Sequence, residues 1–168
     1  MNNITKRILT ALVAIPLIVL ICMAGGIYFF AFISIASALA LKEFYGLVSA
    51  KGAKPLATLG IISGLCINLA FFHNRFSSFV VGIFDSFGVA IPFPTQAQLF
   101  LITTIIIVVV LSLVELFRNN GSAIHNLSTT FMGIFYIPLC FGTFIGLREV
   151  FVPFDFPMFR YFSDPNSF

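Results

Sequence analysis

The chain has 168 residues, of which 60% are hydrophobic and only 9% are charged, and its mean hydropathy is +1.09. Soluble domains carry about 25% charged residues, so this composition excludes a water-soluble globular domain. The net charge of +3 arises from few residues that form no basic tract, which argues against nucleic acid as a partner. The composition therefore predicts an integral membrane protein.

The first apolar region, residues 8–41, predicts two membrane-spanning helices. It contains 34 residues without a charge. As one helix it would measure about 51 Å at 1.5 Å per residue, against a hydrocarbon core of ~30 Å. Gly25 and Gly26 near its centre favour a turn, so we expect a helical hairpin over residues 5–23 and 27–48. A cleaved signal peptide would also begin with this pattern, but the small residues of a cleavage site are missing.

Three further spans are expected, over residues 56–72, 97–117 and 127–147, and Pro138 is expected to kink the last one. Between the third and fourth spans, glycines, prolines and Asp85 interrupt residues 73–96. This segment predicts a loop with a short helix lying in the membrane interface. The sequence thus predicts an all-α polytopic membrane protein with about five transmembrane helices and one interfacial helix.

The basic residues at the ends of the spans predict the orientation. With the N-terminus in the cytoplasm, six Lys and Arg residues are cytoplasmic and three are on the outer side, as the positive-inside rule requires. The six are Lys6, Arg7, Lys42, Lys51, Lys54 and Arg118, and the three are Arg75, Arg148 and Arg160. We expect this orientation in a cell membrane, which in a bacterium is the inner membrane.

Glu43 interrupts the second predicted span, and Arg7 lies at nearly the same depth in the first. Arg7 precedes Gly25 by 18 residues, and Glu43 follows Gly26 by 17. A charge at mid-bilayer costs about 3 kcal/mol on insertion scales, so such residues pair with an opposite charge or face a wet cavity. We expect Arg7 and Glu43 to form an ion pair. The pair either only joins two helices or also meets an anionic headgroup or phosphate.

Two Gly-x-x-x-Gly patterns, Gly60 to Gly64 and Gly142 to Gly146, predict close helix packing. The packing lies either within the chain or between two copies in a homodimer. Glu115 and Arg118 are three residues apart at a predicted helix end, which suits an i,i+3 ion pair.

The chain offers few groups for catalysis. His73 and His125 are expected in loops on opposite sides of the membrane, where they cannot share a metal. The sequence contains no Gly-rich phosphate loop, Ser/His/Asp set or metal-ligand cluster. We therefore assign no catalytic residue and no metal ligand, and only Arg7 and Glu43 are candidates for substrate contact.

Three segments, taken in order, resemble the N-terminal half of the bacterial phosphatidate cytidylyltransferases, also called CDP-diacylglycerol synthases. The first, KRILTALVAIPLIVL, has the family's Arg, here Arg7, followed by Ile-Pro. The second, ALALKEFYGLVSAKGAKP, has its acid and aromatic, here Glu43 and Phe44. The third, SAIHNLSTTFMGIFYIPLCFGTFIGLRE, has the family's Gly-x-x-Tyr span that closes on Leu-Arg, here ending at Arg148.

The resemblance implies an enzyme of phospholipid biosynthesis that transfers a cytidylyl group from CTP to phosphatidic acid. Its products would be CDP-diacylglycerol and pyrophosphate, and Mg²⁺ would be required. The family's metal-binding and signature segments belong to its C-terminal half, and none occurs in these 168 residues. We therefore expect an N-terminal membrane portion that is inactive alone. The alternative is a small non-catalytic membrane scaffold.

Overall fold

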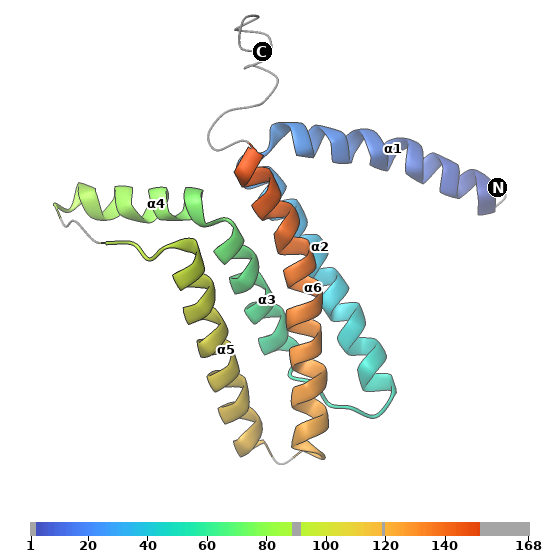
Figure 1. The fold of residues 1–168 in the computed structure, drawn as a ribbon. Coiled ribbons are helices and arrows are strands. Elements are labelled where there is room, and N and C mark those ends of the chain that lie inside the picture. The colour runs from blue at the N-terminus through green and yellow to red at the C-terminus, as the bar shows by residue number, and fades with distance from the viewer. Residues whose placement is uncertain (1–2, 89–91, 119, 152–168) are drawn as a thin grey trace, which may run out of the picture. The chain divides into compact units, whose positions relative to one another are not determined.

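In a computed structural model, the described residues are 3–88, 92–118 and 120–151; of residues 3–11, 13 and 149–151 only the backbone is described. Over these ranges the structure contains helices and no strands, which confirms the predicted all-α class (Figure 1). The helices are α1 (Asn3–Ala24), α2 (Gly26–Ala50), α3 (Ala57–Phe71), α4 (His73–Ser86), α5 (Gln96–Phe117) and α6 (Ala123–Phe151).

Three of these helices are long and apolar enough to cross a membrane, namely α2, α5 and the part of α6 that ends at Arg148. They correspond to three of the predicted spans. A fourth crossing is added if α3 and α4 together form one broken span. Within α1 the apolar segment with described side chains is Ala14–Ala24, which is shorter than a span. The described residues thus supply three to four crossings, and the expected count of about five is approximate.

The described part of the chain divides into two units, which meet between residues 32 and 33 within α2. In the first unit, α1 ends and α2 begins around Gly25 and Gly26, whose φ angles are 60° and 52°. Residues with a Cβ atom rarely adopt this left-handed conformation. The predicted break between the first two helices is therefore confirmed at the predicted residues.

In the second unit, α3 packs between α2 and α6 through contacts that only glycine permits. A Cβ atom on Gly64 would lie 2.7 Å from Leu41 Cδ1 of α2 and 2.7 Å from Pro138 Cγ of α6. The ring of Phe71 likewise fills the space beside Gly142. Both Gly-x-x-x-Gly patterns therefore serve packing within the chain.

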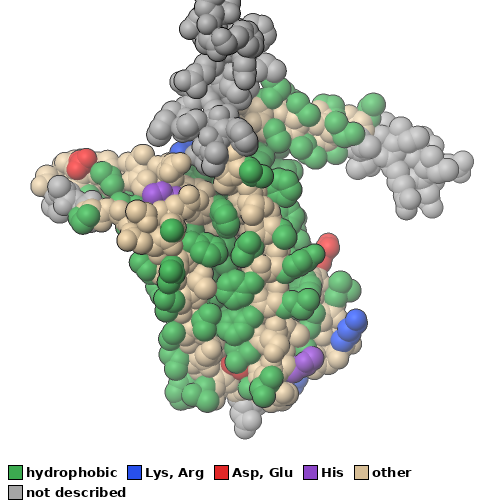
Figure 2. All heavy atoms as spheres, in the orientation of Figure 1, with side chains coloured by type: hydrophobic (Ala, Val, Ile, Leu, Met, Phe, Trp, Pro, Cys, Tyr) green, Lys and Arg blue, Asp and Glu red, His purple; other side chains and the backbone are tan. Residues whose placement is uncertain are grey.

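The core of this unit also includes α5. Ile67 of α3, Ile107 and Leu111 of α5, and Ile134 of α6 form one buried cluster. Outside it, many large apolar side chains on α2, α5 and α6 remain exposed. Figure 2 shows such side chains over the outward faces of these helices. A surface of this kind suits contact with lipid.

The chain turns sharply after α3, because α4 is bent by 86° from it. With 15 residues, α3 is about 22 Å long, too short to cross a ~30 Å hydrocarbon core alone. The third predicted span is thus shorter than expected. The short helix predicted within residues 73–96 is present as α4, none of whose residues is buried. Its location in the interface stays a prediction.

The start of α5 follows from its sequence. The Thr95 hydroxyl accepts a hydrogen bond from the backbone N–H of Gln98, and the Gln98 side chain accepts one from the backbone N–H of Thr95. This capping box satisfies N–H groups that a helix N-terminus otherwise leaves without partners.

Candidate functional site: a buried Glu115–Asn126 network

Polar side chains gather at the end of the second unit where the α2–α3 loop meets the α5–α6 turn. Glu115 comes from the last turn of α5, and Asn126 comes from the first turns of α6. Both are almost completely buried, with 1% and 2% of their surface exposed. A buried carboxylate is stable only when it is paired or hydrogen-bonded, so its partners decide what this site can do.

Both the nitrogen and the oxygen of the Asn126 side-chain amide form hydrogen bonds. Its Nδ2 donates to Glu115 Oε1 at 2.7 Å and to the Asn120 carbonyl at 2.9 Å. Its Oδ1 accepts from the backbone N–H of Lys54 at 2.8 Å. One side chain therefore ties α6 to the end of α5 and to the α2–α3 loop.

Arg118 closes the network on its exposed side. Its Nη1 lies 3.6 Å from Glu115 Oε2, which confirms the predicted i,i+3 ion pair. The same Nη1 donates to the Lys54 carbonyl at 3.0 Å. The pair predicted as a local helix feature thus also holds a loop more than 60 residues away in sequence.

Thr130, one turn further along α6, extends the network to α2 and α3. Its hydroxyl donates to the Asn126 carbonyl at 2.7 Å and accepts from the Leu56 N–H at 3.0 Å, just before α3 begins. Its backbone carbonyl accepts from the Tyr45 hydroxyl of α2 at 3.0 Å. We define the Glu115–Asn126 network as Lys54, Glu115, Arg118, Asn126 and Thr130.

Cationic groups lie around this network. The Lys54 ammonium is 3.5 Å from Asn120 Oδ1 at the surface, and Arg118 is 29% exposed. Lys51 and His125 are exposed at the same end. Figure 2 shows basic and histidine side chains near the end of α2 and the start of α6. The Lys and Arg side chains can donate charge-assisted hydrogen bonds to phosphate oxygens.

The network is not built as a metal site. The oxygens of Glu115 face Asn126 and Arg118 rather than further carboxylates. In the part of the chain that the structure describes, no group of three or more His, Cys, Asp or Glu could hold a metal ion. The residues present therefore do not fit Mg²⁺, and none is assigned as its ligand.

The proposed Arg7–Glu43 ion pair stays a prediction. Glu43 is exposed on α2. The side chain of Arg7 lies outside the described residues, and the two residues belong to different units.

Arg148 lies near the C-terminal end of α6, where the helix dipole favours a positive charge.

The expectation that the two histidines lie in loops was wrong, and their location on opposite sides of the membrane stays a prediction. His73 begins α4, and its Nε2 is 2.7 Å from the Pro94 carbonyl. His125 lies in the first turn of α6. In both cases the helix begins earlier than the hydropathy of the sequence indicates.

Sequence reasoning found the Glu115–Arg118 pair and missed Asn126 and Thr130. Asn126 forms a hydrogen bond with Lys54, which is 72 positions away in the sequence. Thr130 forms one with Leu56, which is 74 positions away. The signal available in the sequence was an amide and a hydroxyl placed one turn apart at the start of an apolar helix.

The helices and their apolar surface define an integral membrane protein. Residues 5–160 match the sequence profile of the Cytidylyltransferase family, and the chain belongs to that family. A protein named phosphatidate cytidylyltransferase from Synechocystis sp. is 29% identical over 132 residues, which are 79% of this chain and 38% of that protein. The chain thus spans well under half the length of this relative. No solved structure matches it.

Proposed function

We propose that the chain is the N-terminal membrane portion of an enzyme that transfers a cytidylyl group from CTP to phosphatidic acid. The family match over residues 5–160 carries the proposal. The relative named phosphatidate cytidylyltransferase supports the choice of substrates. In this reaction a phosphate oxygen of phosphatidic acid attacks the α-phosphorus of CTP, and pyrophosphate leaves.

The part played by this chain is to hold the enzyme in the membrane and to fix the helix ends beside the substrates. CTP and phosphatidic acid are both anions, so the cationic groups around the Glu115–Asn126 network would raise their local concentration. Mg²⁺ in the whole enzyme would neutralise triphosphate charge. We assign its ligands, and every catalytic role, to residues outside this chain.

A chimaera tests the proposal. The matching 132 residues of the Synechocystis relative are replaced by those of this chain, and membranes are assayed for CTP-dependent conversion of labelled phosphatidic acid. We expect the chimaera to be active and this chain alone to give no turnover. A chimaera that inserts normally but lacks activity would contradict the assignment. Turnover by the 168 residues alone would contradict the claim that the active centre lies elsewhere.

The alternative is a non-catalytic membrane scaffold, one form of which would bind another copy through its glycine faces. Because Gly64 and Gly142 both pack inside the chain, these glycines do not support a scaffold of that kind. A homodimer through the transmembrane helices stays a prediction, as do the cytoplasmic N-terminus and the inner-membrane location.

A further inference from the structure

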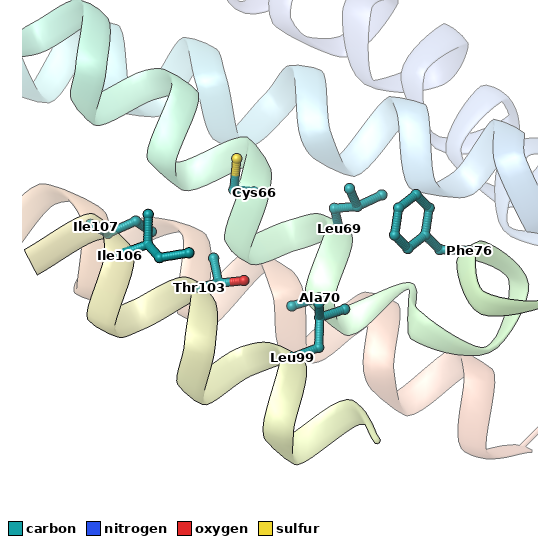
Figure 3. A pocket seen from close by; sticks show the side chains of 8 residues that line it. All are labelled: Cys66, Leu69, Ala70, Phe76, Leu99, Thr103, Ile106 and Ile107. Carbon is teal, nitrogen blue, oxygen red and sulfur yellow. The ribbon is translucent and has the colours of Figure 1, made fainter. Parts of the chain in front are cut away.

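A groove runs along the seam between α3 and α5, in the half of these helices nearer to α4. Its walls are Cys66, Leu69 and Ala70 of α3, Phe76 of α4, and four residues of α5 between positions 99 and 107 (Figure 3). We call it the α3–α5 groove. Its volume is about 230 Å³, and an apolar cavity of ~150 Å³ already holds a ligand the size of benzene.

The lining of the groove determines the chemistry of its ligand. Thr103 provides the sole hydroxyl among the lining residues, Cys66 provides a thiol, and the other six side chains are hydrocarbon. A nucleotide or a phosphate group needs charged donors, which this lining lacks. The lining suits an unbranched hydrocarbon that gains dispersion contacts along its length.

The dimensions of the groove match one leaflet of a bilayer. From Leu99 to Ile107 the groove follows α5 for about 12 Å at 1.5 Å per residue. Half of a ~30 Å hydrocarbon core is about 15 Å. At one end, α4 turns away by 86° and buries none of its residues, as a helix in the headgroup region does. If α4 lies in the membrane interface as predicted, the groove runs from headgroup depth toward the membrane centre.

The width of the groove excludes a protein helix as its ligand. Ile67 of α3 and Ile107 of α5 belong to the same buried cluster, so the two helices touch beneath the groove. A helix with side chains is ~10 Å across and would not enter this seam, whereas a single hydrocarbon chain would. We propose that the α3–α5 groove seats one acyl chain of a membrane glycerophospholipid, independently of the cytidylyl transfer proposed above.

The absence of tryptophan from the sequence makes the proposal testable by fluorescence. Phe76→Trp places a single reporter at the α4 end of the groove (Figure 3). The full chain is reconstituted into phosphatidylcholine vesicles with brominated acyl chains, which quench tryptophan on contact. Thr103→Phe is then added, because Thr103 lines the groove and a phenyl ring there would fill it. The matched control is Ile105→Phe, two residues away on α5 and 53% exposed.

We expect strong quenching of the Phe76→Trp reporter, lost for the most part with Thr103→Phe and retained with Ile105→Phe. Cys66→Phe, which blocks the groove from α3, should act like Thr103→Phe. A second reporter, Leu113→Trp, lies beyond the groove on α5 and is 50% exposed. The quenching of Leu113→Trp should not change with either blocking substitution. This unchanged quenching would show that the helices remain folded. Equal quenching of Phe76→Trp with and without both blocking substitutions would overturn the proposal, as would a reporter that is never quenched.

Discussion

At the scale of single residues, the strongest constraint on this chain is the burial of Glu115. Its carboxylate is 1% exposed and has two partners, Asn126 at 2.7 Å and Arg118 at 3.6 Å. Arg118 keeps access to solvent, whereas Asn126 does not. Asn126 is therefore the partner that water cannot replace. It also holds the Lys54 N–H, so its loss would affect the α2–α3 loop as well as the acid.

We expect Asn126→Ala to lower the free energy of unfolding by about 2–4 kcal/mol, because it leaves a buried carboxylate and the partly buried Lys54 N–H without their best partner. Glu115→Gln should cost less, since the amide oxygen can still accept from Asn126. In the Glu115→Gln background, Asn126→Ala should also cost less than alone. Denaturant titration in detergent micelles measures all three differences. Ser128→Ala, at an exposed position of α6, is the control. A loss from Asn126→Ala no larger than the control's would contradict this account.

At the scale of elements, the glycines of α3 let side chains of neighbouring helices approach its backbone closely. Gly64 admits Leu41 from one side and Pro138 from the other, and Gly60 admits the Tyr45 ring. The sequence patterns around these glycines predicted close packing, because small residues let membrane helices approach one another. They could not predict the partner. A Gly-x-x-x-Gly face is the same whether it meets a helix of its own chain or another copy.

Gly64→Ala should destabilise the protein by about 1–3 kcal/mol, since the added methyl would lie 2.7 Å from Pro138 Cγ and Leu41 Cδ1. Gly46→Ala is the matched control on α2, where nothing lies within 4 Å of the added Cβ. It should be neutral or stabilising by up to about 1 kcal/mol, because alanine is the better helix former. Melting temperatures of the two variants in the same detergent check the difference. Equal melting temperatures would mean that the α3 packing tolerates a methyl group at this position.

At the scale of the whole molecule, hydropathy predicted where helices form but not how they are arranged in space. Backbone groups in lipid must be satisfied within a helix, so long apolar runs such as residues 97–117 became helices as expected. The end of the run 56–72 was predicted to within one residue, because α3 ends at Phe71, but the bend of 86° between α3 and α4 was not predicted. The Lys54–Asn126 contact was likewise not predictable, because no local pattern links residues 72 positions apart.

The location of the charged residues at the two ends of α3 supports a testable orientation. Arg118 contacts Lys54 at the end where α3 begins, and Arg75 lies in α4, which follows the other end. If the positive-inside rule sets the orientation, the end with Lys54 and Arg118 is cytoplasmic. In a chain whose three cysteines, Cys22, Cys66 and Cys140, are replaced by serine, we introduce Ser122→Cys or Ser78→Cys, both at exposed positions.

A membrane-impermeant maleimide added to intact spheroplasts should label the Ser78→Cys chain and not the Ser122→Cys chain. With inverted membrane vesicles the result should be reversed. Labelling after solubilisation in detergent shows that both thiols react when they are reachable. The opposite pattern would place the Glu115–Asn126 network on the outer side, away from cytoplasmic CTP. The cationic groups around the network could not then gather that substrate, and their proposed role would fail even if the family assignment held.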